Sequence, residues 1–228
     1  MAVRALKIVL LGTLVSGIAT TAYAADLYVP APEEQVYAPT EASTWTGFYF
    51  GGELGYGWGQ KDVFDTEEPE DFGSYAISGW LAGAEAGANW QMDQFVLGIE
   101  GDVNWAGISG DGLIDGDDPI STDINLLATL TGRAGLAWDQ LLFYVEGGIA
   151  WVNENHTWNV DEEAVSYSGV GSVMGVGLAY AIDSNWSAKV EYNYMDFGAY
   201  EIEFPNAGED VTFDQTVQTI KFGLNYKF

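Results

Sequence analysis

The stretch TIKFGLNYKF (residues 219–228) decides the fold, because apolar and polar side chains alternate along it. Its apolar face holds Ile220, Phe222, Leu224, Tyr226 and Phe228. Its opposite face holds Lys221, Gly223, Asn225 and Lys227. Successive side chains of a β-strand point to opposite sides, so the pattern predicts a strand with one apolar and one polar face. Alternation over about ten residues is typical of strands that cross a membrane as part of a barrel.

The same alternation recurs upstream, in residues 80–90, 95–105 and 126–138. Large aromatic side chains bracket several of these segments at a spacing of ten residues, as Trp80 and Trp90 do. Ten residues with a rise of about 3.3 Å and a tilt of about 40° span roughly 25 Å, which is the height of the apolar band of an outer-membrane barrel. We therefore predict two aromatic girdles at the membrane interfaces. Their members are Phe48, Trp58, Trp80, Trp90, Phe95, Trp105, Trp138, Trp151, Trp186 and Phe228.

Eight segments of this kind can be counted along the chain. They lie near residues 46–59, 77–90, 95–107, 123–138, 141–153, 167–182, 186–199 and 213–228. The connections are alternately long, near 60–76, 108–122, 154–166 and 200–212, and short, near 91–94, 139–140 and 183–185. The sequence therefore predicts an all-β fold, an eight-stranded antiparallel transmembrane up-and-down β-barrel over residues 45–228. Short turns of such barrels face the periplasm and long loops face the outside of the cell.

The beginning of the chain has the layout of a secretory leader. Arg4 and Lys7 precede an apolar run, and Ala22-Tyr23-Ala24 supplies the small-x-small pattern of a cleavage site. Residues 1–24 are therefore predicted to be a cleaved signal peptide. Residues 25–44 are rich in proline and lack periodicity, so they are predicted to form a periplasmic linker. The expected location is the outer membrane of a Gram-negative cell.

The composition excludes several classes of function. The chain has 34 acidic and seven basic residues and a net charge of −27, which excludes nucleic acid as a partner because phosphate binding needs a basic face. It has no cysteine, so neither a disulfide nor a thiolate metal site is possible. With one histidine and no cysteine, only carboxylate-pair chemistry remains, and acids are so common in this chain that pairs at catalytic spacing would arise by chance. We predict a protein that is not an enzyme and has no cofactor and no assigned metal site.

The polar faces of the strands should fill the barrel interior. They collect Glu53, Glu85, Glu100, Asp102, Arg133, Glu146, Lys189, Glu191, Lys221 and Lys227. Eight strands enclose only enough room for side chains, and charges in that space must be paired or hydrated. The expected arrangement is a network of ion pairs and water that plugs the barrel. A narrow, gated ion path through the network is the alternative.

The expected loops carry most of the remaining acidic residues, as in 61–71 and 111–123. They are expected to form a solvated, mutually repelling surface, with divalent-cation binding as the alternative because carboxylates suit Ca²⁺ and Mg²⁺. His156 is placed in the third long loop and is expected to be solvated.

Five motifs, in this order and spacing, resemble one family over nearly the whole chain after the leader. They are WTGFYFGGELGYGWG (45–59), FVLGIEGDVNW (95–105), TGRAGLAWDQLLFYVEGGIAW (131–151), VEYNYMDFG (190–198) and GLNYKF (223–228). The chain resembles the "porin family" of outer-membrane β-barrels of α-proteobacteria, related to OmpA-like and opacity-type eight-stranded barrels. The resemblance implies surface antigens that stabilise the envelope, some of which bind haem, and it implies no catalysis. It makes a haem ligand the alternative to a solvated side chain at His156, although no apolar haem pocket is evident around it.

The function expected from these observations is a structural outer-membrane barrel with surface-exposed loops. Membrane lipid and lipopolysaccharide are its expected partners, together with the barrel-assembly machinery through the C-terminal strand that ends at Phe228. Two alternatives remain open. One is a porin for small solutes or ions, and the other is a surface protein whose loops bind haem, divalent cations or a host surface.

Overall fold

The computed structural model describes residues 44–65, 71–114, 118–158, 163–204 and 209–228. The predicted signal peptide and almost the whole predicted linker lie outside the described residues. The strands are β1 (Gly47–Asp65), β2 (Asp71–Met92), β3 (Phe95–Ile114), β4 (Asp118–Trp138), β5 (Leu141–Trp158), β6 (Glu163–Ala181), β7 (Trp186–Phe204) and β8 (Glu209–Lys227). The described residues include no helix long and apolar enough to cross a membrane.

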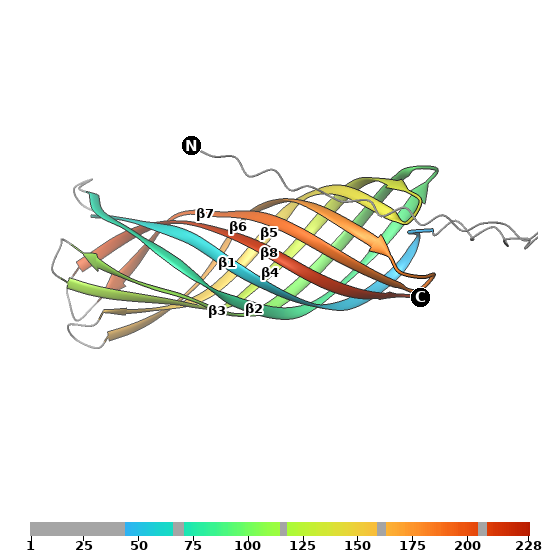
Figure 1. Ribbon diagram of the computed structural model, residues 1–228. Helices are drawn as coiled ribbons and strands as arrows, with labels where there is room; N and C mark the ends of the chain where they lie inside the picture. Colours follow the sequence, from blue (N-terminus) through green and yellow to red (C-terminus); the bar gives the residue numbers. More distant parts are fainter. Residues whose placement is uncertain (1–43, 66–70, 115–117, 159–162, 205–208) are drawn as a thin grey trace, which may run out of the picture. The chain divides into compact units, whose positions relative to one another are not determined.

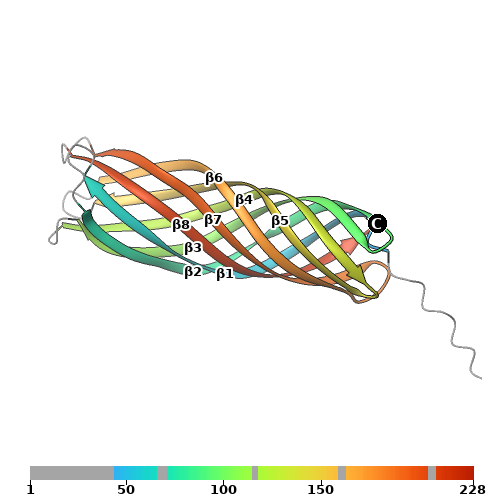
Figure 2. The same cartoon turned by 90° about the horizontal axis from the view of Figure 1, so that it is seen from above.

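Each strand pairs antiparallel with the next, and β8 pairs with β1 to close the barrel (Figure 1). The strands are strongly tilted about the barrel axis (Figure 2). The C-terminal stretch makes the closure, because Phe222 is opposite both Leu54 of β1 and Val190 of β7. Phe222 is exposed on the outer wall, whereas its neighbour Lys221 is buried inside. The predicted eight-stranded antiparallel barrel is confirmed.

The three short connections lie where they were expected, and we call their end of the barrel the turn end. Two of them are two-residue turns that begin with Asp93 and Asp139, which have φ angles of 54° and 52°. Aspartate is one of the few residues other than glycine that tolerates this left-handed region, because its short polar side chain can bond locally. The opposite end, where β1, β3, β5 and β7 finish, is called the loop end.

The predicted long loops were too long. Much of 60–76, 108–122, 154–166 and 200–212 continues the strands, so β1 runs to Asp65 and β5 to Trp158. The acidic residues in these segments concealed a continued alternation. In β1, for example, Lys61 and Val63 are fully buried while Asp62 and Phe64 are only half-buried. Most inward positions of the strand extensions are buried like those of the membrane-spanning parts, although Tyr167 and Tyr200 are half-buried.

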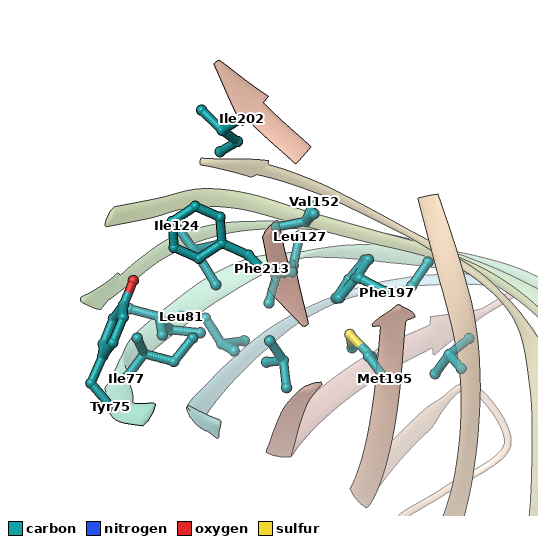
Figure 3. Close-up of a cluster of buried hydrophobic side chains, with 14 of the residues drawn as sticks. Tyr75, Ile77, Leu81, Ile124, Leu127, Val152, Met195, Phe197, Ile202 and Phe213 are labelled. Atoms are coloured by element: carbon teal, nitrogen blue, oxygen red, sulfur yellow. The ribbon is translucent and has the colours of Figure 1, made fainter. Parts of the chain in front are cut away.

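The interior is layered along the barrel axis, and β5 shows the sequence of layers. From the turn end its buried inward residues are Leu142, Tyr144, Glu146, Ala150, Val152, Glu154 and His156. A small apolar cluster with Trp45 therefore comes first, then a charged layer, then a larger apolar cluster with a second polar group among it. Figure 3 shows the larger cluster, in which Leu81, Leu127 and Met195 point into the barrel. Sequence analysis had predicted a filled interior but not this apolar layer.

Candidate functional site

Nine of the ten predicted interior charges form one buried group, which we call the central network. It comprises the carboxylates Glu53, Glu85, Glu100, Asp102, Glu146 and Glu191 and the cations Arg133, Lys189 and Lys221. None of these side chains is more than slightly exposed. The tenth, Lys227, is only half-buried at the turn end, where its ammonium contacts the carbonyl oxygen of Thr44.

Two lysines join most of the carboxylates. The Nζ atom of Lys221 lies 3.2 Å from oxygens of Glu53, Asp102 and Glu191. The Nζ atom of Lys189 lies 2.8 Å from Glu100, 3.2 Å from Glu191 and 3.7 Å from Glu53, and it also contacts Glu85. Such charge-assisted bonds offset the loss of hydration of the two ammonium groups because each of them has several partners.

Arg133 is held between two tyrosine rings. Its guanidinium carbon lies 5.0 Å from the ring centres of Tyr49 and of Tyr144, and its Nη2 donates to Glu100 at 2.8 Å. The two hydroxyl groups continue the network, because Tyr49 donates to Glu100 at 2.6 Å and Tyr144 donates to Glu191 at 2.7 Å. Cation–π contact and hydrogen bonds thus fix the guanidinium on three sides.

Glycines on neighbouring strands make room for these tyrosines. A Cβ atom at Gly87 would lie 2.1 Å from the Tyr49 hydroxyl, and one at Gly177 would lie 2.1 Å from Cζ of Tyr144. Each ring therefore lies flat against bare backbone, a close approach that any side chain would prevent. Neither glycine lies in the five motifs quoted from the sequence, and alternation alone does not reveal this packing.

A second polar group lies among the apolar layer toward the loop end, beyond Trp58 and Trp151. We call it the outer cluster, and its members are Lys61, Tyr75, Thr122, Glu154, His156, Tyr200 and Phe213. Lys61, Glu154 and His156 were predicted to lie in loops, and His156 was expected to be solvated. Those predictions were wrong, because β1 and β5 extend past them and turn all three side chains inward, where they have no exposed surface.

Glu154 is the centre of the outer cluster. Its Oε1 accepts from Lys61 at 2.9 Å, from the Tyr200 hydroxyl at 2.6 Å and from His156 Nε2 at 3.0 Å. Burial disfavours the charged carboxylate, but the bond from His156 and the charge of Lys61 outweigh it and lower the pKa of Glu154 to about 2. Burial lowers the pKa of Lys61 to about 8, with Glu154 acting against the change. At neutral pH the two groups are an ion pair.

His156 is neutral in this arrangement. Burial lowers its pKa below the usual value, and the neighbouring Lys61 adds to the effect while Glu154 opposes it. With Nε2 donating to Glu154, Nδ1 accepts from the Thr122 hydroxyl at 3.0 Å, and Thr122 in turn lies 2.7 Å from the Tyr75 hydroxyl. Both ring nitrogens are engaged inside the barrel, so haem ligation here would require one of these bonds to break and the buried ring to become accessible.

The order Thr122, His156, Glu154 has the form of a hydroxyl nucleophile, a base and an orienting acid. A catalytic use requires that a substrate carbonyl reach the hydroxyl. Thr122, His156 and Glu154 are fully buried, and Tyr75 occupies the position next to the Thr122 oxygen. The arrangement therefore ties β2, β4, β5 and β7 together, with no room for a substrate beside the hydroxyl.

One small cavity reaches the central network from the turn end. Its volume is about 30 Å³, and Trp45, Tyr49, Arg133 and Lys189 are among its lining residues. A volume of this size holds one or two water molecules. The Trp45 Nε1 and Arg133 Nε atoms are both buried and have no hydrogen-bond partner among the described residues, so such water can satisfy them.

The outer wall of the barrel is apolar. Nine of the ten predicted girdle residues are exposed on it, including Trp138 and Phe228, while Trp58 is half-buried with its ring 6.3 Å from that of Tyr192. Leu54, Leu130 and Val176 are among the exposed side chains between them. An apolar surface of this extent is stable only in contact with lipid or another apolar surface.

A closed antiparallel barrel with an apolar outer wall and a polar inward face defines the class of outer-membrane β-barrel proteins. The family described as "Outer membrane protein beta-barrel domain" matches residues 13–228, and the chain belongs to this family. It is thus a protein of the outer membrane, where it lies among lipids, and the resemblance noted from its motifs is confirmed.

Named relatives agree with this assignment. The chain is 32% identical to the 31 kDa outer-membrane immunogenic protein of Brucella melitensis, over 98% of this chain and 100% of the relative. It is 33% identical to the 25 kDa outer-membrane immunogenic protein of Brucella abortus, over 99% and 100% of the two chains. Among solved structures, Neisserial surface protein A is similar at a TM-score of 0.42 and 11% identity, over 80% of this chain and 98% of the other.

Proposed function

We propose that this protein is a structural barrel of the outer membrane that supports envelope integrity and is sealed to solutes. The filled interior carries the proposal. The inward side chains of the central network, the apolar layer and the outer cluster are buried along the described barrel, and the cavity at the turn end has room for only one or two water molecules. Such an interior resists deformation and leaves no aqueous path of solute size.

The proposed orientation puts the turn end in the periplasm and the acidic loop end outside the cell. Residues 1–24 act as the cleaved leader and residues 25–44 as a linker in this proposal. The ten aromatic residues of the outer wall lie at the two membrane interfaces. The strand that ends at Phe228 closes the barrel, and we propose that the assembly machinery recognises it.

The charge distribution supports a particular relation to lipopolysaccharide. Beyond residue 7 the chain has five basic residues. Four of these are buried inside the barrel, and Lys227 lies at the turn end. The described outward surface therefore offers no lysine or arginine to lipid phosphates, while exposed acids such as Asp123 and Glu201 face the same region. We propose that divalent cations bridge these acids to lipopolysaccharide.

The first test is conductance in a planar lipid bilayer. We expect the folded protein to give no steady open-channel steps, because the buried apolar layer blocks a continuous water-filled path through the described barrel. A general porin in the same bilayer provides the positive control, and heat-modifiable gel migration verifies that the protein is folded. Steady, large conductance steps would show that the barrel is a porin and not a structural barrel closed to solutes.

The second test addresses the role in the envelope. A deletion strain is expected to become sensitive to detergent and EDTA, and the full-length protein is expected to restore resistance. A variant with residues 66–70 and 159–162 replaced by short glycine–serine linkers should restore it equally well if the barrel itself is what matters. If only the full-length protein restored resistance to detergent and EDTA, the function would be assigned to the replaced segments and not to the barrel.

A further inference from the structure

Glu146 is the exception in the central network. Its side chain is more than nine-tenths buried, yet it has no hydrogen bond or ion pair with any described residue, and its Oε2 is a buried atom without a partner. Arg133 is directly opposite in the register of β4 and β5, but its guanidinium turns to Glu100 on the other side. An unpartnered carboxylate in such a place has a high energetic cost.

The unpartnered carboxylate of Glu146 lies close to the carboxylates of Glu100 and Glu191. One oxygen each from Glu100, Glu146 and Glu191 can be chosen so that all three lie within 4.8 Å of one another. The central network as a whole holds six carboxylates against three cations, which is a deficit of positive charge in a closed interior. A bound cation, or protonation of some of the carboxylates, can relieve the mutual repulsion between these groups.

The ammonium groups of the network have no bonds left to offer. Lys189 has three hydrogens but contacts four carboxylates, and Lys221 uses its own on Glu53, Asp102 and Glu191. If another cation took over Glu100 and Glu191, Lys189 would still be paired with Glu85 and Glu53. The network can therefore accept a further positive charge without leaving a lysine unpaired.

We propose that Glu100, Glu146 and Glu191 form an interior binding site for one hard divalent cation of the size of Ca²⁺. Carboxylate oxygens are the ligands such ions prefer, and Ca²⁺–oxygen distances of about 2.3–2.6 Å allow two ligands to be up to roughly 5 Å apart. The observed spacing fits this limit, whereas the shorter bonds of Mg²⁺ require the ligands to draw together. The turn-end cavity is lined by Arg133 and Lys189, which both contact Glu100, and we propose it as the route by which the ion and its water enter.

The proposed ion joins strands that do not pair with each other. Glu100 belongs to β3, Glu146 to β5 and Glu191 to β7. Hydrogen bonds of the sheet connect only neighbouring strands, so an ion here would act as a brace across the barrel. Its effect is distinct from the cation bridges proposed for the outward acids, which lie on the surface.

Equilibrium dialysis of the folded, EDTA-treated protein against Ca²⁺ tests the site. We expect Glu146→Gln to bind one ion per chain fewer than the wild type, because one of the three ligands is lost. Asp139→Asn is the matched control, since it also removes one carboxylate, from an exposed turn whose left-handed φ asparagine tolerates. We expect the control to keep the wild-type number of tightly bound ions.

Terbium luminescence gives an independent readout. Tyr49 and Tyr144 donate hydrogen bonds to Glu100 and Glu191, so light absorbed by these rings should reach a Tb³⁺ ion bound between the carboxylates. We expect the signal to be lost in Glu146→Gln and weakened in Glu146→Asp, which keeps the charge but shortens the reach. Equal ion counts and equal luminescence in the wild type and both variants would overturn the site and assign all bound cations to the surface.

Discussion

Lys221→Met is expected to lower the free energy of unfolding by about 3–5 kcal/mol, the range for removing one partner of a buried ion pair. Lys221 is almost completely buried, and its ammonium is 3.2 Å from Glu53, Asp102 and Glu191. Methionine fills most of the same volume but carries no charge, so three carboxylates lose a shared cation. Urea unfolding in lipid vesicles, followed by tryptophan fluorescence, measures the change.

Lys227→Met is the control for Lys221→Met. Lys227 lies six residues, or three periods of the alternation, further along the same face, but it is half-buried and its ammonium contacts a backbone carbonyl. We expect a loss within about 0.5 kcal/mol, as for ordinary surface substitutions. Adding Asp102→Asn to Lys221→Met should recover part of the lost stability, since one uncompensated charge is removed. Similar small losses in both single variants would show that the central network is hydrated and not buried.

Alternation predicted the wall of the barrel well because it is a local property. The outward positions of 219–228 and the aromatic residues near the strand ends follow from a period of two and from strand length alone. The same reasoning assigned Glu53, Glu100 and Lys221 to the inward face, and the structure places them there. Wherever apolar and polar residues alternate, the sequence contains enough information to assign the face.

The prediction of loops was less successful because it relied on composition. The acidic segments around Lys61 and His156 appeared to be loops, since their outward residues are as polar as their inward ones. Beyond the membrane the outward face of a strand meets water, so the contrast between the two faces disappears while pairing continues. The inward residues Val63, Ile120 and Phe213, all fully buried, were the remaining signal.

The partners within the interior could not be predicted from one sequence. Lys61 and Glu154 are 93 positions apart in the chain and belong to β1 and β5, which are not neighbours in the sheet. Their contact depends on the tilt and the stagger of all the strands between them. For the same reason nothing in the sequence distinguishes Glu146, which has no partner in the described part of the chain, from Glu191, which has several.

Acid is expected to weaken the barrel through Glu154. Its pKa is lowered from the usual 4.5 to about 2 in the folded protein. A carboxylate with a lowered pKa stabilises the fold fully at pH values above the unfolded pKa, and this contribution is lost as the pH falls through the folded value. The shift corresponds to about 3 kcal/mol, which should disappear progressively between about pH 5 and pH 2.

His156 acts in the same direction and Lys61 does not interfere. The pKa of His156 is lowered in the folded barrel, so below about pH 6.5 the unfolded chain binds a proton more readily than the folded barrel does. The free energy of unfolding therefore decreases as the pH decreases. Lys61, with a pKa of about 8, stays protonated in the folded barrel throughout this acid range. The decline should therefore begin with the histidine and steepen as Glu154 becomes protonated.

Urea unfolding of the wild type and Glu154→Gln between pH 7 and pH 2.5 isolates the effect of the carboxylate. At pH 7 the variant should be less stable by about 3 kcal/mol, since the charge that pairs with Lys61 is gone. The two proteins should converge as the pH falls, because protonation makes the wild-type side chain neutral as well. Glu201→Gln, at an exposed position of β7, is the control and should follow the wild type at every pH. A stability difference between wild type and Glu154→Gln that stays constant down to pH 2.5 would contradict a buried ion pair between Lys61 and Glu154.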